Sequence, residues 1–127
     1  MRTIYIFALT AVLSGLISAC GAVSKIQPTP TMDAFAAKGY EIFNIRCATC
    51  HAVIPDTVIV GPSLYGVATR AETRMKNYDA EAYISLSILQ PNAYIVEGFT
   101  DTMPKNFGVE LTSEELDALT SFLMTLK

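Results

Sequence analysis

The sequence predicts an all-α domain with three to four helices, and three observations support this prediction. Helix start and stop signals bound segments 34–46 and 80–89, and a capping box opens a third helix near residue 112. No βαβ pattern follows the single CxxC motif of the chain. The 127 residues suffice for one domain, which we place at 33–127, preceded by an N-terminal extension.

Residues 1–19 have the pattern of a secretory signal peptide. Arg2 is followed by an apolar stretch over 4–17 and by small residues before Cys20. The run Ile17-Ser18-Ala19-Cys20 resembles a bacterial lipobox, in which the peptide is cut before the cysteine and its sulfur receives a diacylglyceryl group. We therefore predict lipidation of Cys20, which also accounts for an odd cysteine in an exported protein. An uncleaved membrane helix is the alternative, although the stretch is rather short for a span.

Residues 20–32 are predicted to form a flexible tether behind the lipidated cysteine. They include Pro28 and Pro30 and have no apolar periodicity. Such a tether holds the folded domain at most about 40 Å from the lipid. We expect the domain to lie at the cell membrane, facing the periplasm or the cell exterior, with its partners at the same membrane.

The first helix is predicted from Ala34 to Arg46, with Asp33 as its N-cap. Gly39 lies four residues before Phe43, and this spacing predicts a close crossing with another helix. The apolar side of the helix is expected to contain Phe35, Ile42, Phe43 and Ile45.

The sequence Cys47-Ala48-Thr49-Cys50-His51 is typical of a c-type haem attachment site. Two thiols at this spacing can both form thioethers with one porphyrin, and the histidine that follows then lies under the iron as its axial ligand. One motif predicts one haem c.

Three other interpretations of the motif fit the sequence less well. A thioredoxin-type redox pair needs a βαβ context. A zinc site needs a fourth ligand, but the chain has no second cysteine pair and no second histidine. A disulfide between Cys47 and Cys50 would close a loop too small to stabilise much.

The middle of the chain is predicted to be mostly loop. Segment 52–60 is expected to be irregular or extended and closed by Gly61-Pro62, and segment 67–78 is the one locally basic stretch. A helix follows from Ala80 to Leu89, capped by Asp79 and ended by Pro91. Its apolar side is expected to contain Tyr83, Leu86 and Leu89.

The second axial ligand is expected to be a methionine, because His51 is the only histidine and a lysine would need a depressed pKa. Met103 is the first candidate for this ligand, since it lies in the predicted loop 91–103 and is followed by Pro104. Met75 is the second candidate.

The last helix is predicted to open with a capping box of Thr112 and Glu115. Its buried stripe is expected to contain Leu116, Leu119, Phe122, Leu123 and Leu126.

Together these features resemble the small single-haem c-type cytochromes over residues 33–127. The resemblance is carried by CATCH (47–51), GPSLYG (61–66) and TMP (102–104), in that order. In that family the first and last helices cross, and Gly39, Phe43 and Phe122 match the residues at the contact. Phe122 departs from the commoner tyrosine or tryptophan, which removes a hydrogen-bonding group and keeps the packing.

The resemblance also implies roles around the haem. The carbonyl of Pro62 is expected to fix the proximal histidine, Leu64 to pack on the haem, and Arg70 to pair with a propionate. The run PNAYIVEGF (91–99) resembles cytochrome domains that serve membrane respiratory complexes.

The resemblance implies one-electron transfer rather than an enzyme activity, in a respiratory or photosynthetic chain. The protein is expected to be a tethered carrier or the monohaem subunit of a membrane oxidoreductase, such as an alternative complex III-like quinol-oxidising assembly or an oxidase. A haem enzyme or gas sensor with an open iron position is the alternative, and Met103 argues against it. The net charge of −3 and the lack of a basic stripe argue against nucleic-acid binding.

Overall fold

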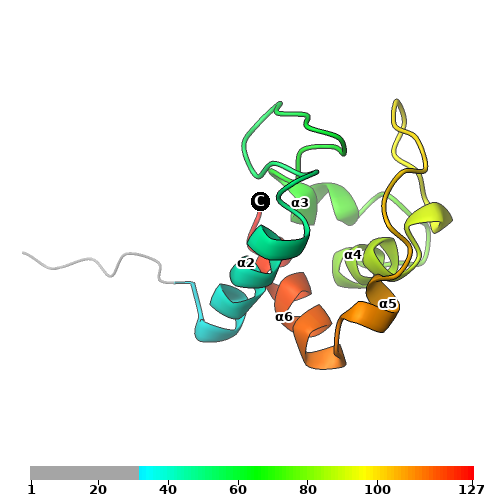
Figure 1. Ribbon diagram of the computed structural model, residues 1–127. Coiled ribbons are helices and arrows are strands. Elements are labelled where there is room, and N and C mark those ends of the chain that lie inside the picture. The colour runs from blue at the N-terminus through cyan, green and yellow to red at the C-terminus, as the bar shows by residue number, and fades with distance from the viewer. Residues whose placement is uncertain (1–31) are drawn as a thin grey trace, which may run out of the picture. The chain divides into compact units, whose positions relative to one another are not determined.

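The computed structural model describes residues 32–127. The predicted signal peptide, Cys20 and residues 20–31 of the predicted tether lie outside the described residues. Within the described part there are five α-helices and one 3-10 helix but no strand, which confirms the all-α prediction (Figure 1). The elements are α2 (Ala34–Arg46), α3 (Val67–Ala71), α4 (Ala80–Leu89), η1 (Pro91–Ala93), α5 (Phe107–Glu110) and α6 (Ser113–Met124).

The three long helices begin where their capping residues predict. The carboxylate of Asp33 accepts hydrogen bonds from the backbone N–H groups of Phe35 (2.7 Å) and Ala36 (3.0 Å) at the start of α2. Asp79 caps α4 in the same way. The predicted capping box of Thr112 and Glu115 opens α6.

The predicted number of helices was too small. The short helices α3 and α5 have only five and four residues, so neither is long enough to show an amphipathic period in the sequence. The 3-10 turn η1 begins at Pro91, the residue that was predicted only to end α4.

The first and last helices cross, as Gly39 predicted (Figure 1). Gly39 lies against the backbone carbonyl of Ala118 in α6, and the side chain of Phe122 packs beside it. The ring of Phe122 contacts Phe43 and Tyr40, with centroid distances of 5.5 and 5.2 Å. A glycine thus allows the backbones to approach, and aromatic rings fill the space on either side.

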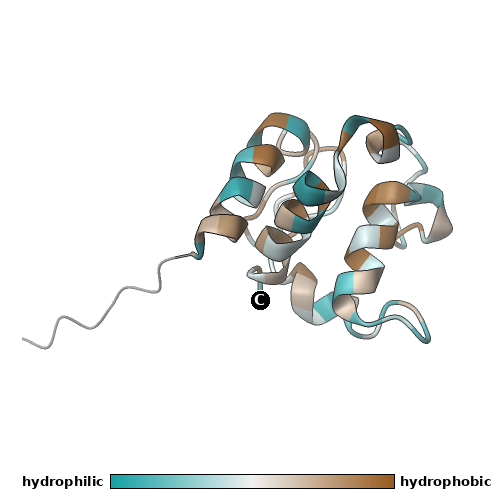
Figure 2. Ribbon diagram, turned by 90° about the horizontal axis from the view of Figure 1, so that it is seen from below, coloured by the Kyte–Doolittle hydropathy of each residue, from teal (hydrophilic) through white to brown (hydrophobic). Residues whose placement is uncertain are grey.

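The buried core lies between α2, α4 and α6 and corrects part of the predicted apolar stripes. On α2, Phe35 and Ile45 are exposed, and hydrophobic and hydrophilic residues alternate along this helix (Figure 2). On α4, Leu89 is exposed, whereas Ile84 and Ile88 join Tyr83 in the core. On α6, the stripe is buried at Leu119, Phe122 and Leu123, whereas Leu116 and Leu126 are only partly buried.

The helices of residues 32–127 were also compared with the length and hydropathy that a membrane span requires. None of them meets both requirements.

Candidate haem site

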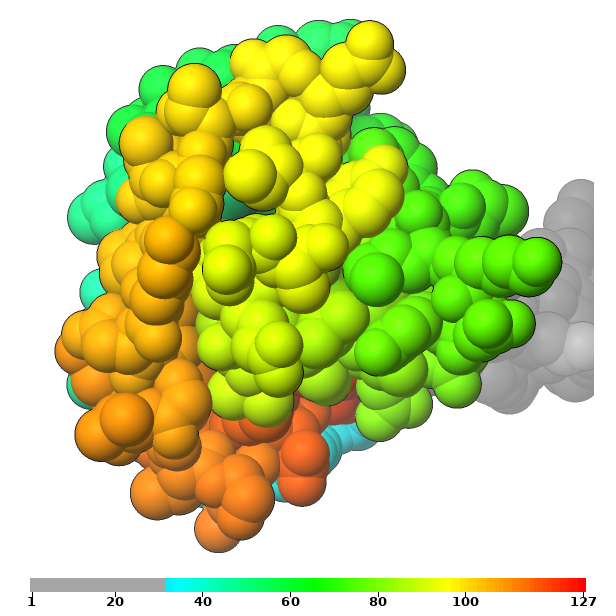
Figure 3. All heavy atoms as spheres, turned by 90° about the vertical axis from the view of Figure 1, so that its right-hand side faces the viewer, coloured from blue at the N-terminus to red at the C-terminus, as the bar shows by residue number. Residues whose placement is uncertain are grey.

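A largely apolar cavity of about 250 Å³ opens between the end of α2 and the segments that follow α4. Its floor is the core face of α4 and α6, where Ile84, Ile88, Leu119 and Leu123 line it. Figure 3 shows a narrow opening between the loop after η1 and the segment leading to α5, with earlier residues visible behind it. The cavity brings together all seven described residues that the sequence predicted for the site: Cys47, Cys50, His51, Pro62, Leu64, Arg70 and Met103.

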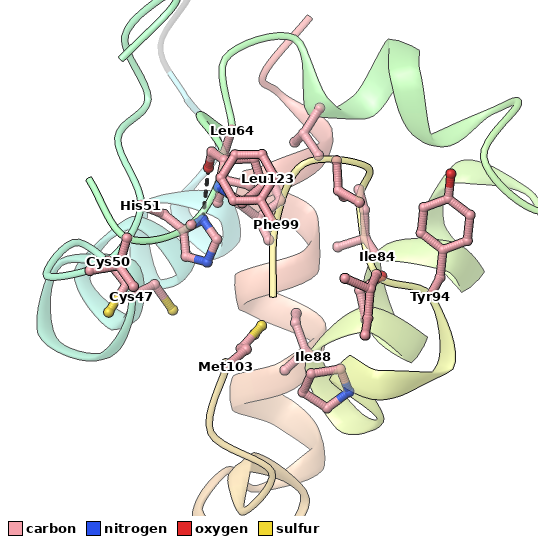
Figure 4. A pocket seen from close by; sticks show the side chains of 18 of the residues that line it. Cys47, Cys50, His51, Leu64, Ile84, Ile88, Tyr94, Phe99, Met103 and Leu123 are labelled. Carbon is pink, nitrogen blue, oxygen red and sulfur yellow. Dashed lines mark hydrogen bonds between the residues drawn. The ribbon is translucent and has the colours of Figure 1, made fainter. Parts of the chain in front are cut away.

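The CATCH motif forms a tight turn at the end of α2. The N–H of Cys47 still bonds to the carbonyl of Phe43, and the N–H groups of Cys50 and His51 both bond to the carbonyl of Cys47. This turn places two sulfurs and an imidazole on the same wall of the cavity (Figure 4). The spacing of the motif therefore corresponds to one turn of backbone, which explains why Cys47, Cys50 and His51 converge although Ala48 and Thr49 lie between the two cysteines.

The imidazole of His51 is held in one orientation by its neighbours. Its Nδ1 donates a hydrogen bond to the carbonyl oxygen of Pro62 at 2.8 Å, which leaves Nε2 free to bind a metal (Figure 4). Gly61 lies directly against the ring, because a Cβ at this position would overlap Cε1 of His51 and come within 2.8 Å of both ring nitrogens. Sequence reasoning treated Gly61 only as a turn former.

Arg70 holds the loop that carries Pro62. Its guanidinium donates hydrogen bonds to the carbonyls of Ser63 (2.8 Å) and Tyr65. The N–H of Leu64 also bonds to the carbonyl of Ala52 at 2.7 Å, so the loop is tied down from two directions. The predicted pairing of Arg70 with a propionate stays a prediction.

Met103 lies on the wall opposite the motif. Its thioether points into the cavity from the loop before Pro104 (Figure 4). Of the four methionines in residues 32–127, it is the one that lines the cavity. Met75, the second candidate from the sequence, packs against the hydrophobic core instead.

A further wall of the cavity contains Arg74, Tyr83 and Tyr94, which the sequence analysis did not assign to the site. The guanidinium of Arg74 lies 6.0 Å from the ring centroid of Tyr94. That ring in turn meets Tyr83 edge-on at 5.7 Å, and all three residues line the cavity. Arg74 follows α3, Tyr83 lies in α4 and Tyr94 follows η1, so their separation in sequence gave no local motif and only the folded chain brings them together.

The environment of Cys47 does not suit a thiol-disulfide reaction. Burial raises the pKa of its thiol to about 11, with a smaller contribution from Cys50. The attacking cysteine of a redox pair has a lowered pKa instead. Before haem attachment a free thiol at Cys47 would therefore stay protonated at neutral pH, unlike the attacking cysteine of a redox pair.

The residues that line the cavity fit a haem. Two thiols, an oriented imidazole and a thioether surround an apolar space, and Gly61 leaves room for the ring of His51. Thiols that can form thioethers, together with an imidazole that can bind iron, are the donors of a c-type haem site. Within residues 32–127 no three histidine, cysteine or acidic side chains are grouped as a metal site of their own.

An all-α fold that surrounds such a cavity defines a haem protein of the c type. The chain belongs to the cytochrome c family, whose family model matches residues 36–127. Members of this family bind haem c covalently through cysteines, and here Cys47 and Cys50 provide that attachment. Family membership also indicates electron transfer. No curated protein sequence matches the chain significantly.

Proposed function

We propose that this protein is a monohaem electron-transfer protein with His51 and Met103 as the axial ligands of the iron, and that it is not an enzyme. The observation that supports this most is the position of Met103, which faces the cavity opposite the histidine (Figure 4). When bound, the haem supplies a one-electron couple whose potential a methionine ligand raises. The chain's own residues hold that group in place and keep water from it.

The backbone on both sides of the proposed haem site is restrained. The bonds from His51 to Pro62 and from Arg70 to Ser63 fix the proximal loop, and Gly61 limits the rotation of the imidazole. On the distal side, Pro104 restricts the backbone that follows Met103. A site that reorganises little suits electron transfer, whereas an enzyme or gas sensor needs an open iron position.

Carbon monoxide binding tests this ligation. We expect the reduced wild-type protein not to bind carbon monoxide at neutral pH and Met103→Ala to bind it readily. Met75→Ala is the matched control, because Met75 packs on the core and does not line the cavity. Rapid binding by the wild type would contradict the proposal, and opening of the site by Met75→Ala would show that the ligand is misassigned.

We further propose that the domain is anchored to the membrane by lipid on Cys20 and exchanges electrons with partners there. The lipobox-like run 17–20 and the proline-containing tether support this anchor. Cys20→Ser should prevent lipidation and leave an unprocessed N-terminus. If Cys20→Ser changes neither the mass nor the membrane association of the mature protein, an uncleaved membrane helix is the better explanation.

The proposed place in metabolism is a respiratory or photosynthetic chain, as a tethered carrier or as the monohaem subunit of a quinol-oxidising or oxidase complex. The run 91–99 supports a respiratory complex. A native gel of mildly solubilised membranes, followed by a denaturing gel stained for haem, separates the two forms. Haem stain from a large native band indicates a subunit, and stain from a small native band indicates a carrier.

A further inference from the structure

Five of the exposed large apolar side chains of residues 32–127 lie in the short segment 54–65, which follows the haem motif. Its exposed apolar patch, which we call the rim patch, consists of Ile54, Val58, Ile59, Val60 and Tyr65. These side chains retain between 48% and 63% of their accessible surface. Asp56 is the only acidic or basic residue in segment 52–66, although the chain as a whole has 21 such residues.

The rim patch is a fixed surface rather than a loose loop. His51 and Val58 form an isolated antiparallel bridge, and the N–H groups of Val60 and Gly61 both bond to the carbonyl of Cys50. The hydroxyl of Ser63 also donates to the carbonyl of Ile54 at 2.6 Å. Because the backbone is already ordered, contact with a partner costs little additional conformational entropy.

The rim patch is continuous with the haem cavity. Val60 lines the edge of the cavity and lies beside Gly61, the residue against the His51 ring, so part of its exposed surface faces the space that a haem would fill. In Figure 1 the loop rises from the end of α2 to one end of the described domain. The segment that borders the opening in Figure 3 differs in charge, since residues 97–105 include Glu97, Asp101 and Lys105.

We infer that the rim patch is the docking surface for a redox partner protein whose own docking face is apolar and nearly uncharged. This inference rests on the proposed electron-transfer function, which requires a partner to approach the haem. Segment 52–66 contributes one charged residue, Asp56, and the guanidinium of Arg70 beside Tyr65 is hydrogen-bonded to the carbonyls of Ser63 and Tyr65. So few charges favour a partner face that is also mostly uncharged, because a charged face would be desolvated there without a counter-charge. Contacts between the apolar side chains of the rim patch and those of the partner then hold the two proteins together.

The size of the rim patch decides between a redox partner and a second copy of this chain. A stable interface uses roughly 20–30 residues on each side, whereas weak electron-transfer encounters lie at the small end of the range. Five side chains suit a brief encounter, after which the partner leaves with or without an electron. A permanent dimer would need a much larger apolar surface.

Stopped-flow mixing with two reduced blue-copper proteins tests this inference, one with an apolar docking face and one with an acidic face. In each reaction Cu(I) is oxidised to Cu(II) and one electron reduces the ferric haem. The cytochrome is the full-length holoprotein in vesicles of neutral lipid. We expect the apolar probe to react faster, with a second-order rate constant that hardly changes between low and high salt.

The variant Ile54→Ser/Val58→Ser/Ile59→Ser removes apolar surface from the rim patch without touching a residue that lines the cavity. We expect its rate constant with the apolar probe to fall about tenfold, because three apolar contacts are lost. The matched control Ile45→Ser/Val109→Ser changes side chains that are 75% and 92% exposed on α2 and α5, and it should react like the wild type.

An unchanged rate constant in the triple variant would overturn the inference, and so would faster, salt-dependent reaction with the acidic probe. Two further results would assign the rim patch to another occupant and overturn it as well. One is a dimer in sedimentation that the triple variant abolishes. The other is protection of an Ile59→Cys thiol from a polar maleimide by the neutral vesicles. Carbon monoxide binding is measured on the same samples, so failure of the proposed function is seen separately from failure of the docking surface.

Discussion

Gly39 of α2 and Ala118 of α6 are in contact through their backbones, with no space for a side chain between them. A Cβ on Gly39 would overlap the carbonyl group of Ala118 and approach Cβ of Phe122 to 2.8 Å. The contact joins the helix that leads into the haem motif to the helix that forms the floor of the cavity. The position of CATCH relative to the core thus depends on a residue eight positions earlier.

Gly39→Ala is expected to destabilise the protein by about 1–3 kcal/mol, because the added methyl group forces the two helices apart. The measurement is urea unfolding of the holoprotein. Gly108→Ala is the matched control, since a Cβ there would meet only Cδ2 of Leu89 at an ordinary 3.5 Å. Equal stability of the two variants would show that the helices separate without cost.

Phe122→Ala is expected to cost about 3–5 kcal/mol, because it removes a ring that is 3% exposed and leaves a cavity between Tyr40 and Phe43. Phe35→Ala is the control, with a side chain that is 42% exposed, and it should cost less than about 1 kcal/mol. Both are measured by urea unfolding. A small effect at Phe122 would mean that the neighbouring rings close the gap.

The sequence predicted the parts of the fold that depend on local signals. The caps at Asp33, Asp79 and Thr112 are short-range hydrogen bonds, so the starts of the three long helices were predictable. The buried faces were less predictable. Phe35 and Ile45 have the spacing of an apolar stripe but are exposed, because α6 contacts α2 along the line of Gly39 and Phe43.

In the site, too, the local sequence patterns were predictable and the contacts between distant residues were not. CATCH and the loop methionine are local patterns, and their side chains meet at one cavity. Gly61 was missed because a glycine before a proline usually indicates only a turn, and its contact with the His51 ring is visible only in three dimensions. Arg74 and Tyr94 were missed because twenty residues separate them along the chain.

Acid is expected to weaken the start of α6. The backbone N–H and the hydroxyl of Thr112 donate to the Glu115 carboxylate, and these bonds lower the pKa of Glu115 below its ordinary 4.5. Because the folded-state pKa is the lower one, this contribution to stability is present above pH 4.5 and is lost as the pH falls through the folded-state value. Urea unfolding of the wild type and Glu115→Gln between pH 7 and pH 3 measures it.

The difference in stability between the wild type and Glu115→Gln should shrink across that acidic range. Asp117→Asn is the control, since Asp117 lies on the exposed side of the same helix and takes no part in the capping box. A difference that stays constant from pH 7 to pH 3 would contradict the proposed protonation of Glu115.

Gly61→Ala is expected to displace the imidazole of His51, because a methyl group there occupies the space of the ring. The expected result is an altered absorption spectrum of the oxidised haem protein and a changed midpoint potential. Gly98→Ala is the control: its φ of +85° makes the substitution strained, but no atom lies within 4 Å of the added Cβ. If both variants keep the wild-type spectrum, the ring is not confined by Gly61.

Arg70→Lys is expected to lower the free energy of unfolding by about 1 kcal/mol, although the charge is kept. The planar guanidinium reaches the carbonyls of Ser63 and Tyr65 together, whereas an ammonium group cannot reproduce that fork. Arg74→Lys is the control, because Arg74 stacks on Tyr94 and a lysine keeps a cation over the ring. Urea unfolding and the midpoint potential are measured on both variants. If Arg70→Lys matches the wild type in stability while Arg70→Gln shifts only the potential, Arg70 acts through its charge on the haem rather than by holding the loop.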